Sequence, residues 1–355
     1  MRVLHLVGSP TDEFHAELSL LYARDCLTAT ADPERYVFLL AYVDPDGCWR
    51  FPDDLSRAAL DAAVTVPVGE AISHLIALDP DVVVPQLFCR TGMTVYRGLF
   101  DVLGVPYVGN RPDAMALGAD KARARVVVAA AGVAVPEAEL LRPGQHPTMA
   151  PPVVVKPVDT DNSVGVSLVR RHGELAPALQ QAFVHSDRVL VERYVELGRE
   201  VRVGVLEVDG DLVCLPLEEY AVGPDAPVRG RDDKLADHGD ELRLVAKDAT
   251  RAWLVDPTDP VNDAVHDLAR RSHEALGCRH YSLFDVRIDP EGRPWFLEAG
   301  LYCSFARQSV VAVMAAGAGV PVESLFATML AQAIAGTPGP GADGKPRAAP
   351  SSRPS

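Results

Sequence analysis

Residues 281–300 read YSLFDVRIDPEGRPWFLEAG, and this stretch contains the pattern that decides the fold. Two apolar runs, Leu283–Asp289 and Arg293–Glu298, flank a Pro-Glu-Gly turn and predict a β-hairpin. Antiparallel pairing around that turn sets Asp285 opposite Glu298, on one face, with Cβ atoms roughly 5 Å apart. The alternative is a surface hairpin with solvated acids. The neighbouring residues are apolar, which favours a cation between the two carboxylates over that alternative. Carboxylate oxygens in this arrangement suit Mg²⁺, which phosphate oxygens and water usually complete.

Two lysines and a polar loop further towards the N-terminus suit phosphate. Lys156 ends the apolar run Val153–Val155, so its ammonium lies at the edge of a predicted sheet and can act as a point charge. The loop Asp159–Gly165 offers backbone N–H groups and small polar side chains such as Ser163, the materials of a phosphate nest. Lys121 lies in the first turn of a predicted helix, where a cation opposes the helix dipole and indicates an anionic ligand. A lysine with no ligand is the alternative interpretation of Lys156.

The next candidate feature is a short strand that ends in an acid. Glu192 closes the apolar strand that begins at Val189, and Tyr194 and Val195 follow it. An acid, an aromatic ring and an aliphatic side chain in this order fit a purine slot, in which backbone atoms contact the base edge. Glu200 would then accept from ribose hydroxyls. The alternative, an edge strand with a salt-bridged glutamate, stays open.

The order of predicted elements indicates an α/β protein with several parts. Strands at Arg2–Val7 and Asp81–Val84 alternate with helices at Glu17–Leu27 and Val68–Leu78, which is typical of a parallel sheet. A helical segment with a break at Gly118 follows. The further elements predicted are a helix at 98–103, a short strand at 106–109, a hairpin over 200–215, a long loop over 224–241, a helix at 260–276 and two helices within 310–330.

Composition excludes several classes of protein. The chain has 355 residues, 48% hydrophobic residues and a formal net charge of −15, which fit a large folded protein. The acidic balance argues against non-specific binding to nucleic acid or to an anionic membrane. No apolar stretch reaches the roughly 20 residues of a membrane span, and the N-terminus does not resemble a signal peptide. Six scattered cysteines without a Cys-x-x-Cys pair predict free thiols and a cytoplasmic location.

These motifs occur along the chain in the order found in the ATP-grasp superfamily, and the chain resembles the D-alanine–D-alanine ligases within it. The matching segments run from residue 1 to about 333. They are Glu17-Leu18-Ser19, Val105-Pro106-Tyr107-Val108-Gly109, Asp120-Lys121, Val155-Lys156-Pro157, Ser163-Val164-Gly165-Val166, Phe284-Asp285-Val286 and Leu297-Glu298-Ala299.

The resemblance implies an N-terminal α/β domain with a parallel sheet over 1–112, followed by two ATP-grasp subdomains with ATP between them. Their expected ranges are 113–192 and 193–335, and 336–355, rich in Gly and Pro, is an expected disordered tail. The implied enzyme is a carboxylate–amine ligase, in which ATP converts a carboxylate to an acyl phosphate that an amine attacks. Amino acids as substrates, Mg²⁺ as the cofactor and a homodimer are implied in the same way.

The resemblance also assigns roles to individual residues. Lys121, Lys156 and Ser163 would hold the phosphates, Glu192, Tyr194, Val195 and Glu200 the nucleoside, and Asp285 and Glu298 the Mg²⁺. Glu17 would meet the amino group of the first substrate, and Ser309 the carboxylate of the second. Lys234 matches a lysine of the family's mobile loop. The catalytic candidates are Glu17, Ser163, Lys234 and Arg307.

The chain departs from the family where the two substrates meet. The family pattern at the metal hairpin is Arg-x-Asp and Glu-x-Asn, but here Leu283 and Gly300 replace the arginine and the asparagine. One oxyanion-stabilising cation and one metal ligand are therefore missing, and Arg307 is the candidate to replace the charge or to bind a substrate carboxylate. These changes predict a ligase of specialised metabolism that forms a dipeptide or a γ-glutamyl bond.

Two alternatives remain open from the sequence. One is a D-alanine–D-alanine ligase, and the other is a nucleotide-binding pseudo-ligase without turnover. A nucleotide-binding oxidoreductase is disfavoured, because no Gly-x-Gly-x-x-Gly follows the first strand.

Overall fold

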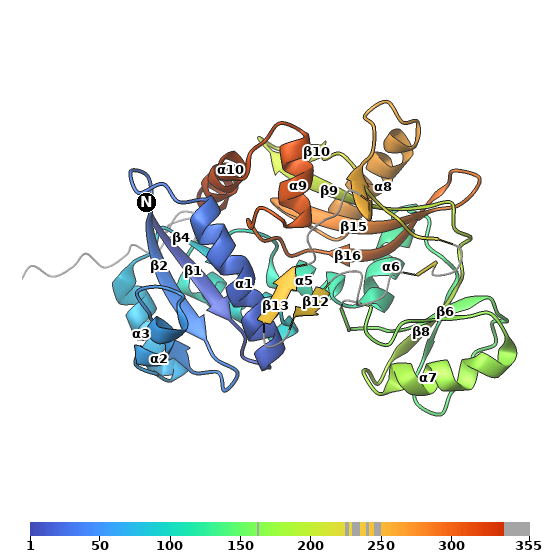
Figure 1. The fold of residues 1–355 in the computed structure, drawn as a ribbon, viewed down its shortest axis with the longest axis horizontal. Helices are drawn as coiled ribbons and strands as arrows, with labels where there is room; N and C mark the ends of the chain where they lie inside the picture. Colours follow the sequence, from blue (N-terminus) through green and yellow to red (C-terminus); the bar gives the residue numbers. More distant parts are fainter. Residues whose placement is uncertain (162, 224–226, 229–234, 239–240, 245–249, 337–355) are drawn as a thin grey trace, which may run out of the picture.

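The computed structural model describes residues 1–336 except 162, 224–226, 229–234, 239–240 and 245–249. Three main sheets lie side by side along the molecule, with helices on their faces (Figure 1). The first sheet has the order β3-β2-β1-β4, and β1 pairs in parallel with both β2 and β4. Its strands are β1 (Arg2–Gly8), β2 (Val37–Val43), β3 (Trp49–Arg50) and β4 (Val82–Pro85). The parallel α/β domain predicted for the N-terminal part is confirmed.

Helices surround this first sheet. They are α1 (Glu13–Ala29), α2 (Arg57–Ala62), α3 (Val68–Leu78), the π-helical turn η1 (Gly92–Tyr96) and α4 (Arg97–Leu103). Asp12 caps α1 by accepting from the backbone N–H of His15 at 2.8 Å, so this helix begins earlier than the apolar spacing from Glu17 predicts. The predicted strand at Pro106–Gly109 is reduced to a single bridge between Val83 and Tyr107.

The second sheet is antiparallel, with the order β5-β8-β6-β7, and α7 covers one of its faces (Figure 1). Its elements are β5 (Ala138–Leu141), β6 (Val153–Pro157), β7 (Ser167–Val169), the short helix η2 (His172–Glu174), α7 (Leu175–Phe183) and β8 (Val189–Arg193). Valines of β6 and β8 pack against Leu175, Leu179 and Ala182 of α7. Burial of this small core holds β6 and the loop after it in place.

The third sheet has the order β14-β11-β9-β15-β16, with β10 on the other part of β9. Its strands are β9 (Arg199–Val208), β10 (Asp211–Cys214), β11 (Glu218–Tyr220), β14 (Ala252–Leu254), β15 (Tyr281–Ile288) and β16 (Pro294–Gly300). The separate pair consists of β12 (Leu235–His238), which falls within the segment predicted as a long loop, and β13 (Glu241–Leu244), which begins at the last residue of that segment. The predicted hairpins at 200–215 and 283–298 are both present.

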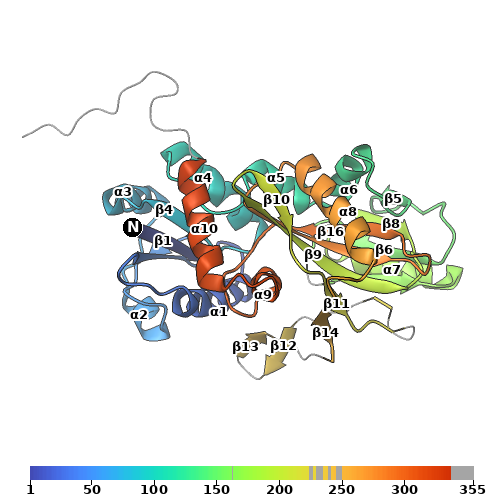
Figure 2. The same cartoon turned by 90° about the horizontal axis from the view of Figure 1, so that it is seen from above.

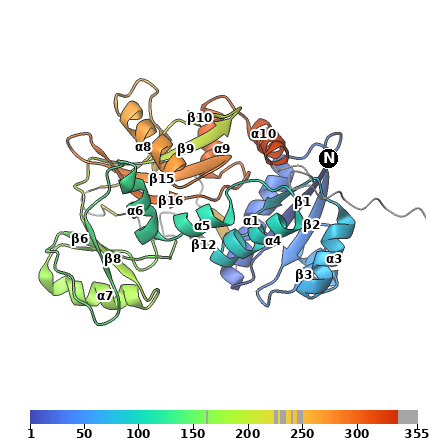
Figure 3. The same ribbon diagram turned by 180° about the vertical axis from the view of Figure 1, so that it is seen from behind.

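Helices cover both faces of the third sheet. On one face lie α5 (Pro112–Gly118), α6 (Lys121–Ala130) and α8 (Val261–Ala275), which Figure 3 shows from behind. On the other lie α9 (Val310–Gly317) and α10 (Val322–Ala335), and α10 runs between the first and third sheets (Figure 2). Phe326 and Met329 of α10 share one core with Val82 and Val84 of β4, which joins the two parts of the molecule. Among the described helices, no single one has the length and apolar composition to cross a membrane, and the bent pair α9 and α10 meets that test only together.

The predicted domain boundaries stay predictions. The second sheet ends one residue beyond the predicted boundary, because β8 runs to Arg193. Helices α5 and α6 pack on the third sheet through Met115, Ala124 and Val128, and Ala122 of α6 also contacts the second part at Leu190. The tail predicted from residue 336 lies outside the described residues apart from Gly336, which ends α10.

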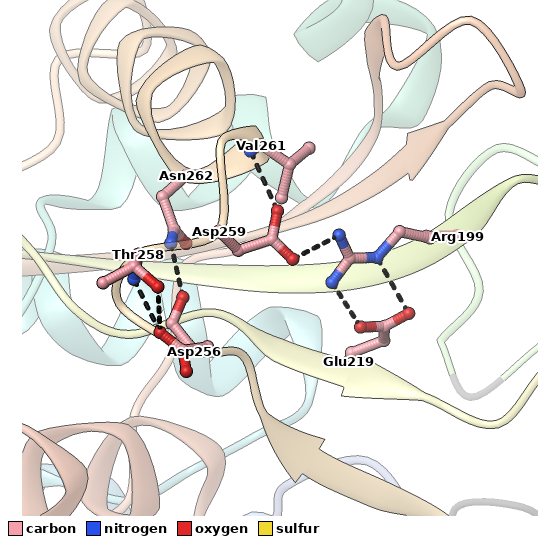
Figure 4. A network of polar contacts seen from close by, with 7 residues as sticks. All are labelled: Arg199, Glu219, Asp256, Thr258, Asp259, Val261 and Asn262. Atoms are coloured by element: carbon pink, nitrogen blue, oxygen red, sulfur yellow. Dashed lines mark hydrogen bonds and ion pairs between the residues drawn. The ribbon is translucent and has the colours of Figure 1, made fainter.

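Arg199 on β9 links this strand to β11 and to the residues before α8 (Figure 4). Its guanidinium donates to both carboxylate oxygens of Glu219 on β11, at 2.9 and 2.6 Å, and to Asp259 at 2.8 Å. Asp259, which precedes the N-cap residue Pro260, also accepts from the backbone N–H of Val261 at the start of α8, at 3.0 Å. A fork of this kind fixes the end of β9.

The buried side chain of His280 links the part of the chain after the first sheet to the third sheet. Its surroundings predict that the folded state loses stability in acid. Its Nδ1 accepts from the backbone N–H of Gly109 at 2.9 Å, which requires the neutral ring. Burial, and then the charges of Arg279 and Arg97, lower its pKa from 6.5 to about 3. The pKa of His280 in the folded state lies below its pKa in the unfolded state. The contribution of the neutral ring to the free energy of unfolding is therefore fully present above pH 6.5 and is lost as the pH falls towards 3.

We therefore expect His280 to account for about 2 kcal/mol of unfolding free energy lost between pH 7 and pH 5. His280→Asn keeps a side-chain acceptor and tolerates the positive φ of 64°. Urea unfolding at the two pH values measures the difference, and the variant should lose less stability than the parent chain between them. An equal loss in both proteins would contradict this role.

Candidate active site

The hairpin register agrees with the sequence prediction, since Asp285 on β15 pairs with Glu298 on β16. On its other side β15 pairs with β9, and Arg202 lies opposite Asp285. Directly opposed residues share a face, so these three side chains form one row across three strands. Arg202 donates from Nε and Nη2 to the two carboxylate oxygens of Asp285.

Two further rows lie on the same face, one on each side of this row. Towards the second sheet, Glu200 on β9 lies opposite Arg287 on β15. On the other side, Leu283 lies between Gly204 of β9 and Gly300 of β16. The two positions that depart from the family pattern are therefore direct partners across the hairpin.

A cavity lies where the second and third sheets meet. Its empty volume is about 760 Å³, counting the part that opens to solvent. Every residue that the sequence analysis assigned to ATP or Mg²⁺ lines it. These are Lys121, Lys156, Ser163, Glu192, Tyr194, Val195, Glu200, Asp285 and Glu298.

The two lysines enter the cavity from different elements and pair with different carboxylates. Lys121 begins α6, and its Nζ lies 3.5 Å from Glu298 Oε2. Lys156 lies on β6, and its Nζ lies 2.7 Å from Glu192 Oε2. Burial disfavours the charged form of Lys121, but the Glu298 and Asp161 carboxylates raise the pKa of its ammonium above the usual value. Both lysines are buried cations, which makes them suited to bind phosphate.

The loop after β6 is bent so that its backbone runs close to the cavity. Ser163 has a positive φ of 60°, and Thr160 Oγ1 donates to the Val164 carbonyl at 3.1 Å. Gly165 also has a positive φ, and a Cβ there would lie 2.8 Å from Pro157. Only glycine fits this position, so the turn follows from the sequence.

At the nucleoside end, Arg287 is buried and pairs with Glu200. Its Nη2 donates to Glu200 Oε2 at 2.5 Å and to the Pro227 carbonyl at 2.7 Å. Its guanidinium also lies 5.8 Å from the centre of the Tyr194 ring. Within the part of the chain that the structure describes, its Nε is buried without a hydrogen-bond partner, and an unmade bond of this kind in a cavity indicates a missing ligand.

Three predicted site residues that the structure describes do not line this cavity. Glu17 on α1 lies 3.5 Å from Arg57, and Arg307 lies 3.8 Å from Asp25 with 56% of its side chain exposed. Ser309 is the N-cap residue of α9, where its hydroxyl donates to the Ser304 carbonyl at 2.5 Å. Lys234 lies outside the described residues.

Sequence reasoning missed Arg202 and Arg287. Each lies two residues from a carboxylate on its strand, Arg202 from Glu200 and Arg287 from Asp285, with a buried valine between the two charges. That alternation was the available signal, because period-two placement of charges in an apolar strand marks one shared face.

The residues present fit ATP and Mg²⁺. Mg²⁺ in phosphate-transfer sites is held by one or two carboxylates together with substrate phosphates, and Asp285 with Glu298 provides that donor set. Lys121 and Lys156 supply cations beside it, and at the far end the buried Arg287 Nε has no hydrogen-bond partner among the described residues.

Comparison with known proteins agrees with this geometry. Residues 144–331 match the family model described as the D-ala D-ala ligase C-terminus. The chain is 32% identical to a D-alanine–D-alanine ligase of Mycolicibacterium smegmatis over 351 residues, which cover 88% of this chain and 92% of that protein. It is 31% identical to the enzyme of Mycolicibacterium paratuberculosis, over 88% of this chain and 93% of that protein.

The chain belongs to the D-alanine–D-alanine ligase family. It is therefore an ATP-dependent, ADP-forming carboxylate–amine ligase, and Mg²⁺ is the cofactor of such ligases.

Solved structures show the same fold. The D-Ala:D-Ser ligase VanG of Enterococcus faecalis superposes with a TM-score of 0.77 over 94% of this chain and 99% of that one, at 21% identity. The D-alanine–D-alanine ligase of Bacillus anthracis complexed with ATP gives a TM-score of 0.70 over 94% of this chain and 98% of that one, at 17% identity. The ATP-grasp fold predicted from the sequence is thus confirmed.

The relatives change the expected function. The sequence analysis favoured a specialised dipeptide or γ-glutamyl ligase because Leu283 and Gly300 differ from the family pattern. The curated relatives named above are D-alanine–D-alanine ligases, so the findings favour the alternative that the sequence analysis left open.

Proposed function

We propose that this ligase joins the carboxyl group of one D-alanine to the amino group of a second. The observation that carries the proposal is the identity of 32% with a D-alanine–D-alanine ligase along 88% of the chain, together with a lined nucleotide cavity. A pseudo-ligase without turnover fits less well, because Asp285, Glu298 and both lysines are all retained in that cavity.

In this proposal the chain's own residues position ATP and neutralise its charge. Lys121 and Lys156 bind phosphate oxygens from opposite sides of the cavity, and the loop around Ser163 closes over them with backbone N–H groups. Tyr194, Val195 and the carboxylate of Glu192 contact the base, and Glu200 binds the ribose. Mg²⁺ held by Asp285 and Glu298 reduces the negative charge of the phosphates when it is bound. Most of the rate acceleration in such a transfer comes from positioning and electrostatics.

The substrate end is assigned to residues outside the cavity. Glu17 meets the amino group of the first D-alanine and Ser309 the carboxylate of the second. Lys234 takes the place of the lysine in the family's mobile loop, and Arg307 binds a substrate carboxylate. The homodimer implied by the resemblance and the cytoplasmic location predicted from the cysteines also remain part of this proposal. Sedimentation at two protein concentrations tests the dimer.

The test of this function is ADP release with defined amino acids. We expect ADP formation with D-alanine alone as both substrates, and a product with the mass of alanyl-alanine. L-alanine and L-glutamate with L-alanine serve as controls, and D-alanine with D-serine shows whether the second site is selective. ADP release that requires glutamate, or ATP binding without turnover in every mixture, would contradict the proposal.

A further inference from the structure

Arg202 is a buried cation beside the carboxylates of the candidate site. Binding of the nucleotide, as proposed above, does not use it. Its side chain is 17% exposed, and its guanidinium pairs with both oxygens of Asp285, which is itself 10% exposed. The same guanidinium lies 5.6 Å from the centre of the Tyr220 ring. A guanidinium stays protonated at every pH used for assay, so Arg202 is a cation here.

Arg202 lies on the substrate side of the carboxylate pair rather than on the nucleotide side. It is absent from the residues that line the nucleotide cavity, whereas its row partners Asp285 and Glu298 both line it. On the other side, its charge acts on Tyr22 of α1 and on Tyr302 after β16. Phe88 packs between those two rings, with its ring centre 5.4 Å from that of Tyr22 and 5.5 Å from that of Tyr302. Arg202 thus lies between the two carboxylates proposed as metal ligands and α1, the helix that carries Glu17.

Arg202 is also placed to supply the positive charge that the family's arginine would carry at position 283, where this chain has leucine. Leu283 is two residues from Asp285 on the same strand face, so Arg202 is its diagonal neighbour across β9 and β15. Diagonal neighbours lie about 7–8 Å apart, within reach of a long side chain. Next to Leu283, a Cβ at Gly300 would meet no atom closer than 3.9 Å. A guanidinium from position 202 therefore reaches the region that an arginine at 283 would serve.

We propose that Arg202 is a catalytic residue that stabilises the oxyanion formed when the amine attacks the acyl phosphate, in place of an arginine at position 283. This inference rests on the proposed function. The amine nitrogen forms a bond to the acyl carbon, and the carbonyl electron pair moves onto the acyl oxygen, whose negative charge faces the guanidinium. That pair then returns, the bond from carbon to the phosphate oxygen breaks, phosphate leaves with the bonding electrons, and the nitrogen loses a proton to water.

Asp285 orients the cation for this role. A carboxylate has room for about four contacts, so its oxygens can hold the Arg202 fork and still bind a metal ion. Two of the guanidinium nitrogens are held by Asp285, and a fork fixed in this way is pre-organised for an anion.

The test separates the two chemical steps. Exchange of ¹⁸O between the β–γ bridge and the β non-bridging positions of ATP reports acyl phosphate formation alone, and dipeptide formation reports both steps. In Arg202→Met we expect dipeptide formation to fall about 100-fold, as for loss of one oxyanion donor, while isotope exchange stays within about fivefold. Adding Leu283→Arg to this variant should restore dipeptide formation at least about tenfold.

Arg199→Met is the matched control on the same strand, because Arg199 pairs with Glu219 and Asp259 outside the cavity (Figure 4). It should lower the melting temperature but leave the ratio of dipeptide formation to exchange unchanged. Arg202→Lys keeps a charge and covers the case in which the methionine variant does not fold.

Equal loss of both steps, an unchanged rate of dipeptide formation, or no rescue by Leu283→Arg would overturn the role of Arg202. Absence of isotope exchange in the parent chain would instead count against the proposed function, so the two failures are distinguishable.

Discussion

Replacing Glu298 with glutamine is expected to lower the rate of ADP formation on the order of a thousandfold. Glu298 faces Asp285 across the hairpin and lies 3.5 Å from the Lys121 ammonium, so it connects the proposed metal site with the phosphate site. An amide has nearly the same shape but no negative charge, and it binds Mg²⁺ much more weakly than a carboxylate does. Loss of the metal removes the largest positive charge next to the phosphates.

The measurement is ADP release at saturating D-alanine over a range of Mg²⁺ concentrations. We expect the variant to need far more Mg²⁺ for half its maximal rate, and the maximal rate to stay low. Glu291→Gln is the matched control, because Glu291 is an exposed residue in the turn of the same hairpin. A Glu298 variant with the Mg²⁺ response of the Glu291 variant would exclude Glu298 as a metal ligand.

The central part of the site could be predicted because it depends on local pairing. Asp285 and Glu298 belong to one hairpin, and a tight turn fixes which residues oppose each other. The rest of the row could not be predicted in this way. Arg202 is 83 residues from Asp285 in sequence, and its strand could have paired with any neighbour as far as its own pattern shows.

The path of the chain after the hairpin also could not be predicted from the sequence. Arg307 was the predicted replacement cation because it follows the metal hairpin closely in the sequence. The segment after Gly300 has no periodicity from which a direction could be read, and its path leads Arg307 to Asp25 on α1, where its backbone N–H donates to that carboxylate at 2.6 Å. The structure thus offers Arg202, rather than Arg307, as the cation beside Asp285.

Helix α6 shows a similar limit for domain assignment. Its apolar residues predict that it is buried, and Asp120 caps it as expected, by accepting from the backbone N–H of Arg123 at 3.0 Å. An apolar face does not specify its partner, however, because the hydrophobic effect is non-directional. Ala124 and Val128 pack against the third sheet, while Lys121 at the start of the same helix reaches the cavity.

The acidic composition makes these few buried cations decisive for ATP. With a net charge of −15, the chain as a whole repels a polyphosphate. Ionic screening limits that repulsion to about 8 Å at physiological salt, so cations inside the cavity control the local potential. Lys121, Lys156 and Arg287 line the cavity from three elements, which is the placement that an acidic protein needs to bind an anion.

Lys121→Met therefore tests the electrostatics of the nucleotide site directly. Lys121 is 8% exposed, and besides Glu298 its ammonium contacts the Thr160 carbonyl in the loop after β6. Methionine fills similar space without charge, so the loss should reflect electrostatics rather than a cavity. We expect kcat/KM for ATP to fall between about a hundredfold and a thousandfold, as when one preorganised charge is removed from a transfer site.

The kinetic pattern identifies the part of the reaction that Lys121 serves. A rise in KM for ATP with kcat unchanged would assign Lys121 to ground-state binding alone, whereas equal falls in kcat and kcat/KM would assign it to the transition state. Arg123→Met is the matched control, because Arg123 is on the same helix with 67% of its side chain exposed and lies 3.4 Å from Asp120. Because the Arg123 side chain is exposed and Asp120 keeps its pair with Arg188 at 2.9 Å, this control should stay within about twofold of the parent chain. If the Lys121 variant did the same, the cavity would not be the phosphate site, and the function proposed for the row of Arg202, Asp285 and Glu298 would lose its support.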